Sequence, residues 1–172
     1  MKQKEILLFG ATGQIGRNLI RKLSKNNYKI IAVTRNIHRA GYILKTQANP
    51  GYLELVEINN FDTRRIDDLI KRCSICVNLI GILYEKKKGQ FKTIHTDLPD
   101  MLSKRMNIFK NDKFIHLSSL GIEKALDSEY AKSKLNGEKK IAQNFKNSII
   151  IKPSIVYSVD DNFTTNFMTL LN

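Results

Sequence analysis

The sequence predicts an α/β protein with a doubly wound parallel sheet. Two observations support this. Six short apolar segments recur along the 172 residues, and segments with apolar residues at helical spacing separate them. The apolar segments are also near-continuous runs, as in Ser148–Ile151, which is typical of strands covered by helices on both faces. Strands and helices that alternate at this spacing indicate three α/β/α layers.

Strands are expected at about residues 4–9, 28–34, 52–58, 75–80, 113–118 and 148–152, and helices at about 14–26, 37–46, 63–72, 92–109 and 129–145. Asp62 can cap the helix at 63, and Asp127 or Ser128 the helix at 129. Right-handed connections then predict the strand order 3-2-1-4-5-6 and one domain over residues 1–172.

A glycine-rich turn joins the first strand to the first helix, with Gly10, Gly13 and Gly16 at regular spacing. In a strand–turn–helix context this pattern predicts a dinucleotide site. The first glycine permits the tight turn, the second lets the backbone approach a pyrophosphate, and the third lets the helix pack close to the strand. The phosphates would lie at the helix N-terminus, contacted by the same turn with Thr12, Gln14 and Ile15. The alternative is an ordinary glycine-rich turn.

The end of the second strand indicates which dinucleotide is bound. An NAD site usually has an acidic residue there, but this chain has Thr34 and Arg35. A guanidinium suits a 2′-phosphate, and Arg17 and Arg39 are further cations. We therefore expect NADP(H) in preference to NAD(H). The alternative is that Arg35 is an ordinary surface residue.

Tyr130 and Lys134 form a Y-x-x-x-K pattern at the start of the last helix, where residues four apart share a face. Lys134 would bind the nicotinamide ribose and lower the pKa of Tyr130, which would exchange a proton with a carbonyl or hydroxyl substrate. Ser119, after the fifth strand, would hold the substrate oxygen. A second copy at Tyr84 and Lys88 falls in a charged loop and is discarded, although chance matches are common in a lysine-rich chain.

These motifs together resemble the atypical short-chain dehydrogenase/reductases, a Rossmann-fold group. They are especially similar to the family containing the nucleotide-binding accessory subunit of respiratory complex I and its bacterial relatives. The stretches that carry the resemblance are Asn78–Gly81, Lys113–Ser119, Tyr130–Lys134 with Gly137–Lys139, Ile150–Ser154 and Asp161–Phe163.

The resemblance implies further site residues and a role. It places Asn59 against the adenine, and Ile80, Gly81 and Pro153 beside the cofactor; for Asn59 and Gly81, plain turn chemistry is the alternative. The complex I subunit is regarded as a structural, NADPH-holding component. We therefore expect NADPH binding with a structural or assembly role in a membrane respiratory complex. An active reductase, epimerase or dehydratase and a nucleotide-sensing regulator are the alternatives.

This chain departs from the family in two ways. Ser158 follows Tyr157 where members usually have glycine. Members also continue into a smaller substrate-side region, whereas this sequence stops at Asn172, as either a natural short form or a fragment. The missing region and an open site predict slow turnover or none.

Composition narrows the function classes. The net charge is +13, but the lysines are scattered, and the dense cluster Glu85–Gly89 has no interleaved aromatics, so we expect no nucleic-acid partner. No apolar run is long enough to span a membrane, and the N-terminus does not resemble a signal peptide. A cytoplasmic location is therefore expected. If a respiratory complex is the partner, the protein would be peripheral on the inner face of the inner membrane. Cys73 and Cys76 are expected to be small buried residues, with no metal or redox role.

Overall fold

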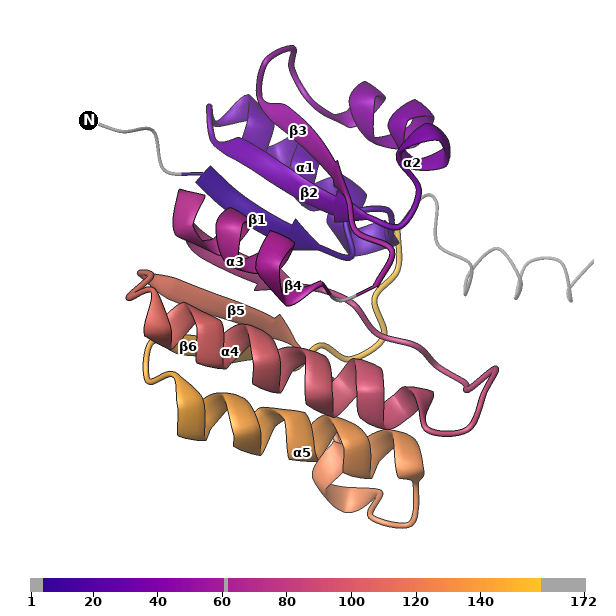
Figure 1. Ribbon diagram of the computed structural model, residues 1–172. Coiled ribbons are helices and arrows are strands. Elements are labelled where there is room, and N and C mark those ends of the chain that lie inside the picture. The colour runs from indigo at the N-terminus through magenta and orange to yellow at the C-terminus, as the bar shows by residue number, and fades with distance from the viewer. Residues whose placement is uncertain (1–4, 61, 159–172) are drawn as a thin grey trace, which may run out of the picture.

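The computed structural model describes residues 5–60 and 62–158. Six parallel strands form one sheet in the predicted order β3-β2-β1-β4-β5-β6 (Figure 1). The strands are β1 (Glu5–Phe9), β2 (Lys29–Thr34), β3 (Leu53–Glu57), β4 (Cys73–Asn78), β5 (Lys113–Leu117) and β6 (Ser148–Ile151). The helices are α1 (Gln14–Lys25), α2 (Ile37–Leu44), α3 (Thr63–Arg72), α4 (Leu98–Ile108) and α5 (Glu129–Asn144), with short segments η1 (Lys45–Gln47), η2 (Lys92–Asp97) and η3 (Ile122–Lys124).

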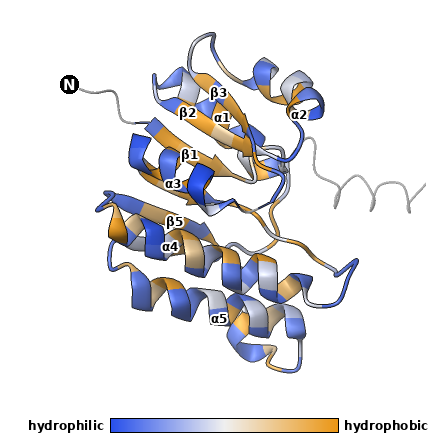
Figure 2. Ribbon diagram, in the orientation of Figure 1, coloured by the Kyte–Doolittle hydropathy of each residue, from blue (hydrophilic) through white to orange (hydrophobic). Residues whose placement is uncertain are grey.

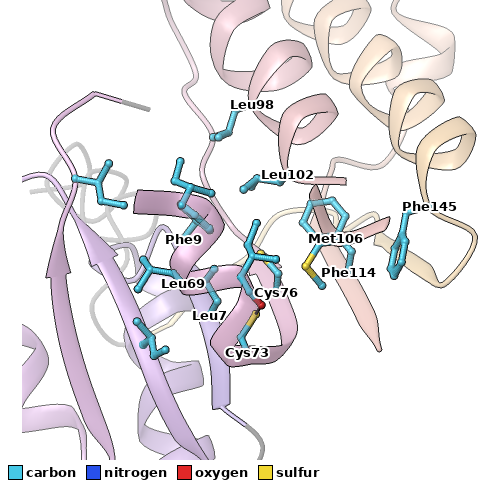
Figure 3. Packing of buried hydrophobic residues seen from close by; sticks show 14 of the residues in the cluster. Leu7, Phe9, Leu69, Cys73, Cys76, Leu98, Leu102, Met106, Phe114 and Phe145 are labelled. Atoms are coloured by element: carbon cyan, nitrogen blue, oxygen red, sulfur yellow. Dashed lines mark hydrogen bonds between the residues drawn. The ribbon is translucent and has the colours of Figure 1, made fainter. Parts of the chain in front are cut away.

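Helices cover both faces of the sheet, and β1 shows how the sequence divides its side chains between them. Leu7 and Phe9 join the cluster that includes residues of α3, α4 and α5, shown in Figure 3. Ile6 and Leu8 join the cluster with α1 and α2. Successive side chains of a strand point to opposite faces, so a fully apolar strand packs against both layers. Figure 2 shows this division as apolar strands between helices whose outer surfaces are polar.

The helix predicted at 92–109 is two segments. Residues 92–97 form a π-helix, and α4 begins at Leu98. Pro99 supplies the physical reason, because it has no N–H to donate to the carbonyl of His95 four residues earlier. That carbonyl points at α5 instead. A Cβ placed on Gly137 would lie 1.9 Å from the His95 oxygen, so only glycine allows α5 to lie this close.

The fourth strand also differs from its predicted bounds. It begins at Cys73, directly after α3, and ends at Asn78 rather than residue 80. Both cysteines are buried, and burial raises the pKa of the Cys73 thiol to about 12. Two predicted helix caps are present: Asp62 accepts from the backbone N–H of Arg64, and Ser128, not Asp127, accepts from Ala131.

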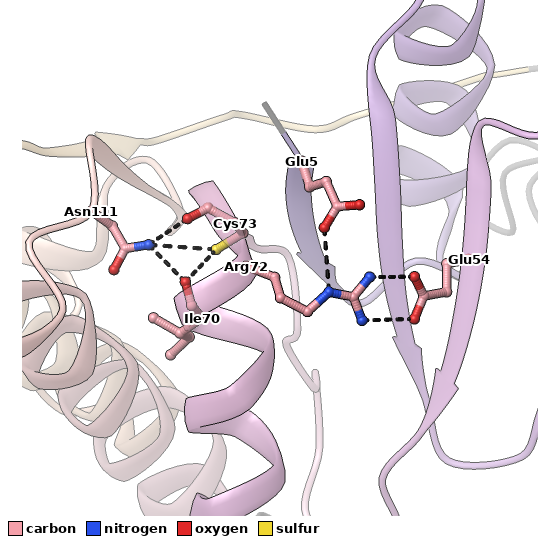
Figure 4. A network of polar contacts seen from close by, with 6 residues as sticks. All are labelled: Glu5, Glu54, Ile70, Arg72, Cys73 and Asn111. Carbon is pink, nitrogen blue, oxygen red and sulfur yellow. Dashed lines mark hydrogen bonds and ion pairs between the residues drawn. The ribbon is translucent and has the colours of Figure 1, made fainter. Parts of the chain in front are cut away.

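Polar contacts tie the end of α3 to the sheet (Figure 4). Arg72 makes two hydrogen bonds to the carboxylate of Glu54 on β3 and lies 3.4 Å from a carboxylate oxygen of Glu5 on β1. Asn111 donates to the carbonyls of Ile70 and Cys73. Arg72 and Glu54 are about half exposed, so the amide contacts hold this corner more firmly than the ion pair.

The contact between α5 and η2 predicts opposite effects for two glycine-to-alanine substitutions. Gly137→Ala should lower the free energy of unfolding by about 1–3 kcal/mol, because a backbone oxygen occupies the Cβ position and cannot rotate away. Gly41→Ala is the matched control within α2, where the nearest atom is a side-chain carbon at 3.9 Å. It should raise stability by about 0.5–1 kcal/mol. Denaturant unfolding measures both, and a neutral Gly137→Ala would contradict the packing described.

Two buried histidines predict how stability depends on pH. Burial lowers the pKa of His116 on β5 to about 3 and that of His95 in η2 to about 4. The unfolded chain takes up these protons near pH 6.5 and the folded chain does not, so stability falls as pH falls. Between pH 7 and 5 each histidine should cost about 2 kcal/mol.

Denaturant unfolding at the two pH values measures this loss. His116→Gln should reduce it by about half, whatever the substitution does to stability at pH 7. His38→Gln, which removes an exposed histidine of α2, should retain the wild-type loss. An undiminished loss in His116→Gln would show that His116 is not kept neutral by the fold.

Candidate nucleotide-binding and acid/base site

The glycine turn holds three backbone segments in direct contact. Gly10 has a φ of +80°, and a Cβ on it would lie 2.8 Å from the carbonyl carbon of Leu79. A Cβ on Gly16 would lie 2.4 Å from the carbonyl oxygen of Gly10. Side chains at these two positions would therefore force α1 away from β1, and the turn away from the end of β4. Packing within the fold therefore explains why both positions are glycine.

Gly13 differs from its two neighbours in the motif. Its φ is −69°, and a Cβ would meet only the oxygen of Gly10 at 3.4 Å. It is exposed at the N-terminus of α1, and no side chain caps this end of the helix. Thr12 is also exposed, and Gln14 and Ile15 begin the helix. Packing within the fold does not require glycine at position 13. Close approach of a phosphate would require it.

The end of β2 carries the residues expected to distinguish the cofactors. Thr34 is buried and its hydroxyl contacts the backbone of Asn36, while Arg35 is exposed. Glu57, at the end of neighbouring β3, was not singled out from the sequence. Its carboxylate accepts from the N–H of Ile37 at 2.7 Å, and this bond lowers the pKa of Glu57. A carboxylate thus already occupies the N-terminus of α2, which begins two residues after Arg35.

Asn59 donates to this same carboxylate at 3.2 Å, so the residue expected at the adenine is coupled to Glu57. Glu57 lies twenty residues from Ile37 in sequence. Its position as an acidic residue at a strand end was the one feature of the sequence that could have indicated its role. Arg17 donates to the carbonyl of Thr12 at 3.0 Å, across the glycine turn. Arg39 is exposed on α2.

Ser119 and Tyr130 lie together, as their proposed roles require. Their hydroxyl oxygens are 2.8 Å apart. The Lys134 ammonium lies 5.6 Å from the centre of the Tyr130 ring and 3.4 Å from the carbonyl of Leu117. Lys134 is only 5% exposed, and burial lowers its pKa to about 8 while Glu138 acts in the opposite direction.

Gly81 connects this cluster to the glycine turn. It follows Leu79 and Ile80, whose backbone packs against Gly10, and a Cβ on it would lie 3.8 Å from both the Lys134 ammonium and His95 Nε2. Pro153 lies at the same edge, where its carbonyl accepts from the N–H of Leu120. The turn, the end of β4 and the first turns of α5 therefore form one continuous surface. The segment Asp161–Phe163 lies outside the described residues.

His95 is a residue that sequence reasoning missed. Its Nε2 accepts from the N–H of Ile82, so Nδ1 carries the proton and donates to Ser133 at 2.9 Å. Ser133 in turn donates to the carbonyl of Tyr130, and the imidazole lies edge-on to the Tyr130 ring at 5.3 Å. Through these hydrogen bonds a neutral His95 links the segment after β4 to α5. The sequence shows only a single histidine within a predicted helix, and that pattern does not predict these contacts.

Known proteins resemble the chain in both sequence and structure. A model of the NmrA-like family matches residues 2–94. The 40 kDa subunit of NADH-ubiquinone oxidoreductase from Neurospora crassa is 24% identical over 96% of this chain and 44% of its own length. NADH dehydrogenase (ubiquinone) 1 alpha subcomplex subunit 9 of Mus musculus is 27% identical over 93% and 42%. Ceramide reductase of Caulobacter vibrioides is 24% identical over 96% and 50%. The chain thus spans about half the length of these curated relatives.

Solved structures show the same fold. The UDP-glucuronic acid 4-epimerase from Bacillus cereus superposes with a TM-score of 0.75 and 24% identity, over 90% of this chain and 57% of that one. A metagenomic short-chain oxidoreductase superposes with a TM-score of 0.69 and 16% identity, over 99% and 91%. None of the helices that the structure describes is long and apolar enough to cross a bilayer.

The resemblance predicted from the motifs is therefore confirmed. The sheet is that of the Rossmann fold, and the relatives include the complex I subunits that the motifs indicated. The family model covers more than half of the chain. The protein belongs to the NmrA-like family and is a domain of the atypical short-chain dehydrogenase/reductase type.

Proposed function

We propose that this protein binds NADP(H) along the edge formed by the glycine turn, Gly81 and Lys134. The observation that carries the proposal is the buried Lys134 ammonium, whose one hydrogen bond among the described residues is a long one to Leu117. An ammonium has three donors, and a buried one needs partners. Ribose hydroxyls placed there would supply them. The solved relatives include complexes with NAD and with NADP.

The remaining contacts follow from the same placement. The N-terminus of α1 and the open backbone at Gly13 would receive the pyrophosphate, with Thr12, Gln14 and Ile15 beside it. Asn59 would face the adenine, and Ile80 and Pro153 would border the nicotinamide half. Arg35 would contact the 2′-phosphate. Glu57 is close to that corner, but its charge is satisfied by the first turn of α2 and by Asn59.

We further propose that the bound cofactor has a structural or assembly role in a membrane respiratory complex. Two relatives support this role, since they are named as subunits of NADH-ubiquinone oxidoreductase and NADH dehydrogenase (ubiquinone). A peripheral position on the inner face of the inner membrane would follow from it.

A second candidate function is reduction of a carbonyl, favoured by the contact between Ser119 and Tyr130. The dinucleotide would supply the hydride. Tyr130 would give a proton to the substrate oxygen, Ser119 would hold that oxygen, and Lys134 would orient the nicotinamide ribose. The 2.8 Å contact between the two hydroxyl groups supports this candidate, because both hydroxyls would have to reach one substrate oxygen.

Cofactor preference provides the first test. Titration calorimetry should show tighter binding of NADPH than of NADH. Arg35→Ala should reduce this preference about tenfold or more, because a charge-assisted phosphate contact contributes about 1.5–3 kcal/mol. Lys29→Ala, at the opposite end of β2, makes the same charge change and should retain the preference. Equal affinity of the wild type for the two cofactors would refute the NADP(H) assignment.

Turnover provides the second test. Tyr130→Phe removes the acid/base hydroxyl and leaves the ring that packs on His95. If the role is structural, both proteins should bind NADPH within about threefold of each other and neither should oxidise it with a panel of aldehydes and ketones. Brisk oxidation by the wild type that Tyr130→Phe abolishes would establish the reductase instead.

A further inference from the structure

The loop between β4 and η2 presents apolar side chains directly to solvent. It projects from the body of the protein on the side where the strands end (Figure 1). Leu83 is 83% exposed and Tyr84 is 68% exposed, and they are adjacent in the chain. Isolated exposed apolar residues are common, but two large ones adjacent to each other in a projecting loop favour a binding surface.

Three lysines follow these two residues at once. Lys86, Lys87 and Lys88 are all exposed, and none pairs with a carboxylate of the residues that the structure describes. Glu85, the acidic residue in between, turns back into the loop and accepts from the N–H of Phe91 at 2.6 Å. The outward charge of the loop is therefore positive.

The loop is shaped by its own hydrogen bonds. The side-chain oxygen of Gln90 accepts from the N–H groups of Lys86 and Lys87, and Gly89 closes the turn with a φ of +89°. Leucine, tyrosine and lysines are thus presented together on an ordered turn. No further folding is needed for them to act as one surface.

We propose that this loop, Leu83–Lys88, docks the protein onto an anionic membrane surface. Leu83 would enter the acyl boundary, and Tyr84 would sit at the level of the headgroups, where aromatic rings with a polar end are favoured. The three lysines would contact lipid phosphates. Leu120, after β5, and Tyr157, after β6, are also exposed.

The composition of the loop favours a membrane over other partners. Protein interfaces are depleted in lysine at their centres, whereas this loop has three beside its apolar residues. Single-stranded nucleic acid needs aromatic side chains among the cations for base stacking, and Leu83 would contribute nothing to it. The proposal does not depend on the cofactor site.

Vesicle flotation of the 172-residue chain tests the proposal. The protein should bind phosphatidylcholine vesicles that contain phosphatidylglycerol, and bind pure phosphatidylcholine weakly. At about fivefold per lysine, Lys86→Gln/Lys87→Gln/Lys88→Gln should weaken binding about 100-fold. Leu83→Ser/Tyr84→Ser should weaken it about tenfold or more, because it removes the inserted apolar area.

A matched control is needed because the whole chain carries a net charge of +13. Lys22→Gln/Lys25→Gln/Lys29→Gln removes the same charge from exposed positions at the opposite end of the sheet, and should change binding by less than about threefold. Equal losses in the two triple variants would overturn the proposal, as would wild-type affinity in Leu83→Ser/Tyr84→Ser. Binding to a single-stranded oligonucleotide without binding to anionic vesicles would also overturn it.

Discussion

Close backbone contact at Gly10 and Gly16 is the constraint on which the rest of the site depends. Gly16 brings α1 against the carbonyl of Gly10, and Gly10 lies against Leu79 just beyond β4. The atoms that face Gly10 and Gly16 belong to the backbone, so they cannot move aside as the end of a side chain would. The position of the helix N-terminus and the path of the chain after β4 are thus set together.

That coupling extends to α5. The chain after β4 passes Gly81, which lies beside Lys134, and then Ile82, which is held by His95. His95 reaches the first turn of α5 through Ser133. Lys134 is buried with little hydrogen bonding from the described residues, and its pKa is lowered to about 8. Perturbed groups of this kind gather at functional sites, which makes the surface between the glycine turn and α5 the natural place for a ligand.

The architecture could be predicted from the sequence because two strong patterns agree. The glycine turn identified the first strand and helix, and apolar runs at regular spacing identified the other strands. The bounds of β4 and the π-helical segment could not be predicted the same way. The π-helical segment depends on the missing N–H of Pro99 and on the absence of a side chain at Gly137, about forty residues later, where a Cβ would lie 1.9 Å from the His95 oxygen.

The site was predictable only where a motif is local. Tyr130 and Lys134 share one helix, and Ser119 ends the strand before it, so their proximity could be expected. The contacts of His95 and Glu57 join residues 38 and 20 positions apart, and no local pattern encodes them. The cofactor roles of these residues remain predictions.

Gly13 offers the most direct measurement of the central claim, that the glycine turn receives a dinucleotide. Its φ is one that alanine adopts, and a Cβ would meet only one oxygen, at 3.4 Å. Titration calorimetry with NADPH should therefore show Gly13→Ala binding about tenfold or more weakly than wild type, while its melting temperature stays within about 2 °C. Unchanged affinity in Gly13→Ala, or no NADPH binding by the wild type, would contradict the account.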